Sequence, residues 1–210
     1  MTGMATQHQS VGALPVGAVL PTAFFARASD EVAADLIGKV LWRRGFGGGR
    51  ISEVEAYLSA KDPASHAARG RTARNWPMFG PPGCLYVFLS YGVHCLLNIV
   101  CDRVDLGSAV LIRSYQPAGD RAPRGDKGRD ERGARGPGLV GRSLDIGLEL
   151  SGLPLGERSG VFVLDDGVRP EVGRAKRVGI SQGADLALRH YLMGSSYVSG
   201  PAWMIGGRRR

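Results

Sequence analysis

The segment around residue 55 combines carboxylates with an aromatic side chain in a pattern that could do acid–base chemistry. Residues 50–57 have the composition of a β-strand, along which alternation would place Glu53, Glu55 and Tyr57 on one face. Strands disfavour glutamate, so two carboxylates on one strand need a reason. One reason is an ordinary solvated strand face; the other is a general base held beside a ring.

Two further polar residues interrupt apolar strands. Arg113 ends the run Val-Leu-Ile-Arg, and a buried guanidinium is usually paired with a carboxylate, for which Glu55 is the natural candidate. Asn98 lies within the apolar run 94–101, where a buried amide must find hydrogen-bond partners. Each residue could serve the fold alone, or could also face a ligand.

Histidine and aromatic residues supply candidate binding surfaces. His66 lies in an irregular loop, where a lone histidine is usually an exposed residue without a specific role. Tyr86 and Phe88 share one face of a strand, as core residues also do. Tyr91 is harder to explain as a fold residue, because the tip of a turn is normally exposed and prefers Asn, Asp or Gly.

The elements that would hold these residues are mostly strands. Thr22 and Ser29 are expected to cap two short helices, at 23–27 and from 30 to Gly38. A third helix is expected over 139–150. Strands are expected at 40–42, 50–57 (with a bulge), 84–90, 94–101, 109–115, 161–164 and 190–193. The runs 84–90 and 94–101 form a hairpin about Tyr91-Gly92. The predicted fold is α+β: a single domain with a curved antiparallel β-sheet, flanking helices and a protruding β-hairpin.

The length and composition favour one globular domain. The chain has 210 residues, of which 43% are hydrophobic and 22% charged, and no linker divides it. Residues 1–20 are expected to form a flexible N-terminal arm, 21–205 the domain, and 206–210 a basic tail. Residues 118–136, built of Arg, Gly, Asp and Pro, have no apolar periodicity and are expected to form a charged, mobile insertion.

The net charge of +8 favours a polyanionic partner such as nucleic acid, although a GC-rich genome would also explain the excess of arginine over lysine. No export signal or membrane span is recognisable. The three cysteines form no C-x-x-C pair. We therefore expect a soluble cytoplasmic monomer, associated with the nucleoid if the source is bacterial.

The order of these signals closely resembles the alkyladenine (3-methyladenine) DNA glycosylase family. The resemblance rests on Glu-Ala-Tyr-Leu at 55–58, the loop histidine, Pro-Gly-x-Leu-Tyr-Val at 82–87, Tyr-Gly at 91–92, Asn-Ile at 98–99 and Val-Leu-Ile-Arg at 110–113. It continues in Gly-Pro-Gly at 136–138, Arg-Val-Gly at 177–179 and Leu-Arg-His-Tyr at 188–191. It runs from about Phe24 to Ser199, interrupted by the charged insertion.

The resemblance implies a base-excision-repair enzyme that acts on duplex DNA. It would flip an alkylated or deaminated purine out of the helix, hydrolyse the N-glycosidic bond and leave an abasic site, as a monofunctional glycosylase without metal or cofactor. Glu55 matches the glutamate that activates the attacking water. Arg113 and the main-chain carbonyl of Val178 match groups that help to hold this water.

The resemblance also implies which residues bind the flipped base. Tyr57 and His66 match the residues that sandwich it, and Phe88 stands where the family often has tyrosine, so that a hydroxyl is missing. Asn98 matches the asparagine that disfavours the 2-amino group of guanine. Tyr91 matches the hairpin side chain that enters the minor groove and fills the vacated stack.

Three other activities are weighed against this one. A non-catalytic nucleic-acid-binding module would explain the charge and the aromatic residues, but not a carboxylate such as Glu55, which repels phosphates. A zinc base deaminase needs H-x-E and P-C-x-x-C, and neither motif occurs. A glycosylase with lyase activity needs an amine nucleophile, but the four lysines lie outside the matched motifs.

Overall fold

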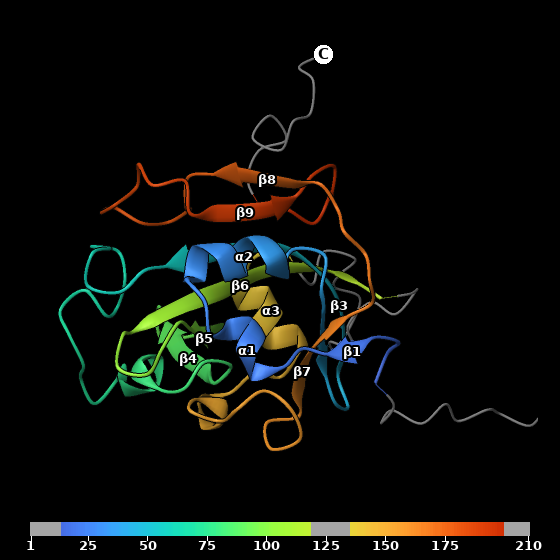
Figure 1. Cartoon of the computed structure of the whole chain (residues 1–210), viewed down its shortest axis with the longest axis horizontal. Helices are drawn as coiled ribbons and strands as arrows, with labels where there is room; N and C mark the ends of the chain where they lie inside the picture. Colours follow the sequence, from blue (N-terminus) through green and yellow to red (C-terminus); the bar gives the residue numbers. More distant parts are fainter. Residues whose placement is uncertain (1–13, 119–134, 200–210) are drawn as a thin grey trace, which may run out of the picture.

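The computed structural model describes residues 14–118 and 135–199, which form a curled antiparallel sheet with a few short helices (Figure 1). The helices are α1 (Thr22–Phe25), α2 (Ser29–Leu36) and α3 (Pro137–Ser143), with 3-10 turns η1 (Trp76–Phe79) and η2 (Leu148–Leu150). The strands are β1 (Ala18–Val19), β2 (Val40–Arg43), β3 (Gly47–Tyr57), β4 (Leu85–Ser90), β5 (His94–Cys101), β6 (Ser108–Pro117), β7 (Val161–Asp165), β8 (Val172–Ala175) and β9 (Arg189–Leu192). The predicted α+β class, with its antiparallel sheet and β4–β5 hairpin, is confirmed.

The long strand β3 is where the sheet curls. The strand order is β1-β7-β2-β3-β6-β5-β4, and β9 pairs with both β3 and β8. The first part of β3 pairs with β2 and its last part with β9, while β6 follows it along the other edge. Its register shifts at Glu53, which confirms the predicted bulge. Because β3 pairs first with β2 and then with β9, the sheet bends along this strand.

Two glycines let β3 pass between its neighbours. Gly48 and Gly49 lie in the strand, which begins before the run 50–57 where it is expected. A side chain at Gly48 would collide with the carbonyl oxygen of Leu41, and one at Gly49 with that of Gln116. Only glycine permits this close approach on both sides.

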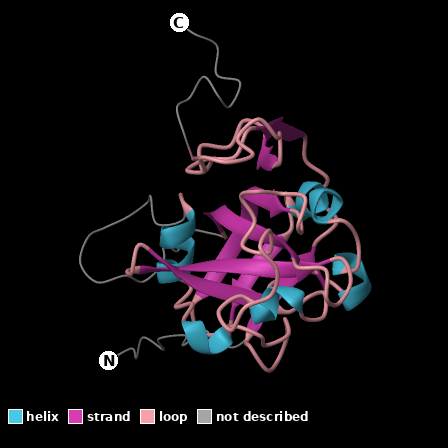
Figure 2. Cartoon of the chain, turned by 90° about the vertical axis from the view of Figure 1, so that its left-hand side faces the viewer, coloured by secondary structure: helices cyan, strands magenta, loops and turns pink. Residues whose placement is uncertain are grey.

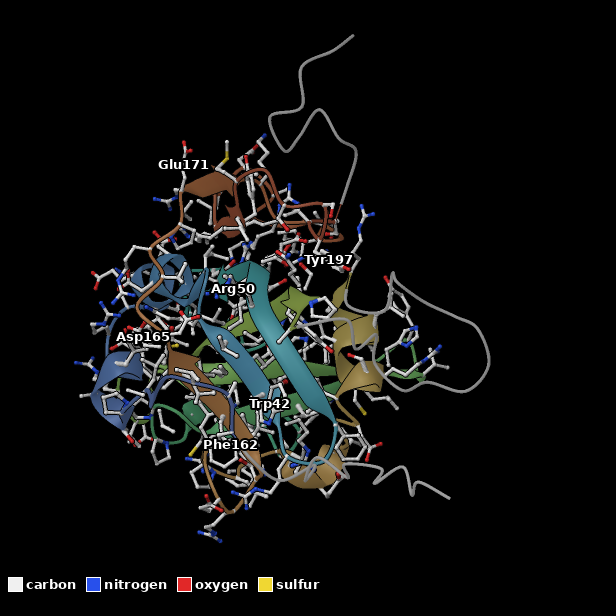
Figure 3. The ribbon with its side chains drawn as sticks, turned by 90° about the vertical axis from the view of Figure 1, so that its right-hand side faces the viewer. Trp42, Arg50, Phe162, Asp165, Glu171 and Tyr197 are labelled. Carbon is white, nitrogen blue, oxygen red and sulfur yellow. The ribbon has the colours of Figure 1, made fainter. Side chains whose placement is uncertain are left out.

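Helices α2 and α3 help to enclose the main hydrophobic core against the sheet. Val32 and Leu36 of α2 and Val140 of α3 are buried with Ile51 and Val54 of β3. Figure 2 shows the helices around the margin of the central strands. A smaller cluster on β2 and β7 includes Trp42 and Phe162, which are register partners and appear on the side facing the viewer in Figure 3.

Two local predictions are wrong, and one strand was missed. The N-cap positions are Pro21 and Ala28, so that Thr22 and Ser29 are the first helical residues and cap nothing. The hydroxyl of Ser29 instead donates to the main-chain oxygen of Tyr57, 3.3 Å away. Strand β8 was not predicted, because its Val-Gly-Arg-Ala sequence carries little β signal.

The other wrong prediction is the helix expected over 139–150, which is broken in the middle. Asp145 has a left-handed backbone (φ 49°), and the amide of Ile146 donates to the oxygen of Gly141 at 2.8 Å. The amide of Asp145 donates to Arg142, so these two bonds form a Schellman motif that ends α3. The left-handed position usually holds glycine, so an aspartate there gives no sequence signal that the helix ends.

Part of the expected N-terminal arm belongs to the sheet, since Ala18 and Val19 pair with β7. Residues 1–13, the expected tail at 206–210 and residues 119–134 of the expected insertion lie outside the described residues. Among the described residues, no helix has the length and apolar character needed to cross a bilayer.

Candidate active site

A cavity of about 360 Å³ opens on the face of β3 to β6 opposite to the main core, a volume within the usual range of small-molecule sites. Strands β3 to β6 and the loops after β3 and β8 supply its walls. Of the residues to which the family resemblance assigns a role, all but Glu55 line this cavity: Tyr57, His66, Phe88, Tyr91, Asn98, Arg113 and Val178. Residues from four strands and from the loops after β3 and β8 therefore meet in one place.

Glu55 is fully buried and is bonded to three of the lining residues. Its Oε1 accepts a hydrogen bond from the main-chain amide of Val178 at 2.7 Å and forms an ion pair with Nη1 of Arg113 at 3.2 Å. Its Oε2 accepts a hydrogen bond from the hydroxyl of Tyr57 at 3.0 Å. The carboxylate is not part of a solvated strand face; it is held in one orientation at the edge of the cavity.

Glu53 is the carboxylate whose role the sequence did not reveal. It is also fully buried, and its Oε1 accepts from Nε of Arg113 at 2.9 Å and from Nη1 of Arg189 at 3.1 Å. The amide and hydroxyl of Ser199 donate to it at 2.6 and 2.7 Å. Arg113 therefore bridges Glu53 and Glu55. Both carboxylates lie on the same face of β3, as alternation predicts, which lets one guanidinium reach both.

The ring of Tyr57 is held by a second buried ion pair. The guanidinium of Arg177 lies 4.7 Å from the ring centroid, and it binds Asp62 through two bonds of 2.5 and 2.7 Å. Burial, and then the charge of Glu55, raise the pKa of the Tyr57 hydroxyl, which stays a donor at neutral pH. Asp62 and Arg177 were missed, although a charged residue just before Val178-Gly179 was a visible signal.

His66 faces two aromatic side chains of β4. Its Nδ1 lies 2.8 Å from the hydroxyl of Tyr86, and its ring meets that of Phe88 edge-on with centroids 4.5 Å apart. Burial, and then the charge of Arg74, lower the pKa of His66, so the imidazole is neutral at physiological pH. Burial raises the pKa of Tyr86 to about 12. Tyr86 thus joins the cavity wall, as its alternation with Phe88 indicated.

Asn98 has the hydrogen bonds of a structural amide and also lines the cavity. Its Nδ2 donates to the main-chain oxygens of Tyr86 at 3.0 Å and Leu96 at 3.3 Å. Both amide hydrogens are therefore engaged by backbone carbonyls. The side chain cannot turn without losing both bonds, which makes it a rigid part of the wall.

Tyr91 stands at the tip of the β4–β5 hairpin in a conformation that tyrosine rarely adopts. Its φ is +50° and that of Gly92 is +72°, and the amide of Val93 donates to Ser90 at 3.1 Å. This is a β-turn with a positive φ at both central positions, where Asn-Gly is favoured. The Tyr91 side chain is 93% exposed, so no packing in the protein compensates for the strain.

No group of three or more His, Cys, Asp and Glu side chains within residues 14–118 and 135–199 could hold a metal ion. The polar groups around the cavity are instead a buried carboxylate, an arginine, phenols, an amide and a neutral imidazole. This set can bind a flat aromatic molecule between rings and direct a carboxylate toward it.

Comparison with known proteins agrees with this geometry. The family model described as methylpurine-DNA glycosylase (MPG) matches residues 23–196. A protein of Burkholderia lata named "Putative 3-methyladenine DNA glycosylase" is 44% identical over 192 residues, which are 88% of this chain and 93% of that relative. A Rhizobium meliloti protein with the same name is 48% identical over 179 residues, 84% of this chain and 94% of the relative. The chain belongs to the methylpurine-DNA glycosylase family.

Proposed function

We propose that this DNA glycosylase removes alkylated or deaminated purines, of the 3-methyladenine, 7-methylguanine and hypoxanthine type, from duplex DNA. Membership of the family makes it a hydrolase of N-glycosyl bonds in base excision repair. The observation that best supports the proposed chemistry is the Glu55 carboxylate, bonded to three residues of an aromatic cavity.

Access to a base in a duplex requires that the base be extruded, at a cost of a few kcal/mol. A side chain that enters the vacated stack keeps the duplex open. Tyr91 suits this role because it projects from a hairpin tip and lines the cavity mouth. In the proposal it enters the minor groove while the extruded purine occupies the cavity between Tyr57, His66 and Phe88.

Glu55 acts in the proposal as a general base. A carboxylate has about four lone-pair sites, and the amide of Val178, the guanidinium of Arg113 and the hydroxyl of Tyr57 occupy three. The remaining site can accept a hydrogen bond from water. Water then attacks C1′ of the sugar, its proton passes to Glu55, and the bond electrons leave with the base.

One carboxylate suffices for an alkylated base. Sugar hydrolases pass through an oxocarbenium-like state and usually need a second carboxyl group as acid. A purine that already carries positive charge leaves without protonation, and the negative charge of Glu55 stabilises the developing cation. The role expected for the Val178 carbonyl, to hold the water, stays a prediction; the contact seen at Val178 is through its amide.

Asn98 excludes guanine in the proposal by shape. Guanine differs from hypoxanthine by its exocyclic 2-amino group. Because the Asn98 amide is held by two carbonyls, it cannot move aside for that group. A rigid obstacle of this kind would protect the vast excess of normal guanine.

The proposal is tested with the pure enzyme, acting as a monomer, on duplexes that carry one hypoxanthine or one 7-methylguanine. The expected products are the free base and an intact strand with an abasic site, which alkali then cleaves. Binding without release of a base would identify a non-catalytic DNA-binding module. Strand breakage without alkali or heat would identify lyase activity and refute the monofunctional mechanism.

A further inference from the structure

The pair formed by Arg177 and Asp62 is buried and is joined by two hydrogen bonds. The Arg177 side chain has no exposed surface; besides its two bonds to Asp62 it donates to the main-chain oxygen of Ala56 at 3.0 Å. Asp62 in turn accepts hydrogen bonds from the amides of Leu58 and Ala64, both at 3.1 Å. A buried guanidinium that is bonded to both Asp62 and Ala56 is a fixed charge, because it cannot move away without losing these bonds.

This fixed charge covers one face of the Tyr57 ring. The guanidinium carbon lies 4.7 Å from the ring centroid, within the range of a cation–π interaction. Tyr57 lines the cavity, whereas Arg177 does not and has no exposed surface. The guanidinium must therefore lie on the ring face that is turned away from the cavity, and the cavity meets the opposite face.

We propose that Arg177 sets the charge preference of the base pocket, by making the Tyr57 wall less attractive to a purine with a fixed positive charge. The inference rests on the proposed function and deepens it. A ring attracts cations through the negative charge on its two faces. When a guanidinium already occupies one face, its field opposes a second cation on the other. A neutral purine such as hypoxanthine is not repelled in this way.

Asp62 does not cancel this effect at the ring. The group in contact with Tyr57 is the guanidinium, and Coulomb interactions fall with distance. The Tyr57 hydroxyl responds to this charge: burial and Glu55 raise its pKa, and Arg177 acts in the opposite direction.

Phe88 provides the contrasting wall. Its ring neighbours are His66, which is neutral, and Tyr86. Across the described part of the chain, no arginine or lysine is found over the Phe88 ring at cation–π distance. Phe88 thus keeps the affinity for a cationic purine that Tyr57 has partly lost. The two walls of one pocket differ in the base charge that they favour.

The first test removes both charges together, so that no buried ion is left unpaired. Single-turnover excision rates of 7-methylguanine, which is cationic, and hypoxanthine, which is neutral, are measured in matched duplexes. In Asp62→Asn/Arg177→Gln the ratio of the 7-methylguanine rate to the hypoxanthine rate should rise roughly 3- to 10-fold. In the control Arg44→Gln/Glu157→Gln, which removes an exposed ion pair outside the cavity lining, the ratio should not change.

An unchanged ratio in Asp62→Asn/Arg177→Gln, even with both rates reduced, would mean that Arg177 only supports the loop, and would overturn the inference. Absence of any base release by the unaltered protein would instead contradict the proposed function. The two failures are therefore distinguishable.

A second test keeps the buried pair intact and removes each ring in turn. Phe88→Leu should lower the ratio, because the wall that favours cations is lost. Tyr57→Leu should leave the ratio unchanged or raise it, even though both rates fall with the loss of the hydroxyl bonded to Glu55. A lower ratio in Tyr57→Leu than in Phe88→Leu would refute the proposal. This result does not depend on whether Asp62→Asn/Arg177→Gln folds.

Discussion

Replacing Tyr91 by asparagine should stabilise the fold and weaken the interaction with DNA at the same time. Tyr91 has a φ of +50°, and a left-handed backbone costs an ordinary residue roughly 1–2 kcal/mol, while asparagine tolerates it well. The side chain is 93% exposed, so the substitution sacrifices almost no buried area. We expect Tyr91→Asn to raise the free energy of unfolding by about 1 kcal/mol, or Tm by roughly 2–4 °C for a chain of this size.

The effect on DNA should have the opposite sign. Stacking of an aromatic side chain on bases is worth about 1–3 kcal/mol, and asparagine cannot supply it. Affinity for a duplex with one hypoxanthine should therefore fall roughly tenfold, and a fluorescent reporter base should show a smaller flipped population. A turn residue without a function predicts no such loss.

Val93 offers a matched control at the same hairpin tip. It is 70% exposed but does not have a positive φ. Val93→Asn should therefore bring no gain in Tm, and should affect flipping less than Tyr91→Asn. If Tyr91→Asn leaves Tm unchanged, the turn stores no strain. If it leaves both flipping and affinity unchanged, Tyr91 is an ordinary exposed turn residue and the wedge must be sought elsewhere.

Three other predictions follow from the same geometry. Glu55→Gln keeps the shape of the side chain but cannot take a proton, so single-turnover cleavage should fall at least ~10²-fold while binding to damaged duplex persists; Glu31→Gln, on the exposed side of α2, should cleave normally. Asn98→Ala should raise excision of mispaired guanine relative to hypoxanthine by roughly tenfold, measured as a ratio of single-turnover rates. His66 and His190 both have pKa values lowered chiefly by burial, so the unfolded chain binds more protons. The free energy of unfolding, measured in urea, should therefore rise as pH increases toward and through 6.5, and less steeply in His190→Gln.

Each of these predictions has a clear contrary result. Near-normal cleavage by Glu55→Gln would remove it as the base. A guanine-to-hypoxanthine ratio that does not move in Asn98→Ala would return Asn98 to the role of a satisfied structural amide. A pH dependence of stability that is identical in His190→Gln would mean that the buried imidazole is not responsible.

The strands of this fold were predictable because their apolar alternation is local. The hairpin of β4 and β5 is visible as two apolar runs on either side of Tyr91-Gly92, and the register confirms it from Leu85 with Ile99 to Ser90 with His94. The end of α3 was not predictable by the same means. It depends on Asp145 in a conformation that only the surrounding bonds make acceptable.

The site was predictable where family motifs mark it and hidden where it depends on tertiary partners. Glu55, Tyr57 and Arg113 lie in recognisable motifs. Glu53 looked like one of two solvated carboxylates on a strand, because its partners Arg189 and Ser199 follow more than a hundred residues later. Alternation places both carboxylates on one face of the strand, but it does not reveal that this face is buried or that one arginine contacts both.

The buried charges explain why the segment after β7 belongs to the site. Arg177 and Arg189 lie near or within the β8–β9 pair, which is beside α2 in Figure 1. They form ion pairs with Asp62 of the loop after β3 and with Glu53 of β3. Acidic and basic side chains balance in this network: Glu53, Glu55 and Asp62 against Arg113, Arg177 and Arg189.

Well-packed apolar residues would often stabilise a fold as well as such ion pairs do, so stability alone does not account for burying them. The proposed general base gives a reason, because a buried carboxylate is costly unless fixed positive charges accompany it. Arg113 supplies that charge to Glu55 but also pairs with Glu53. Arg189 gives Glu53 a second positively charged partner. Removing Arg189 should therefore impair catalysis from a position outside the cavity lining.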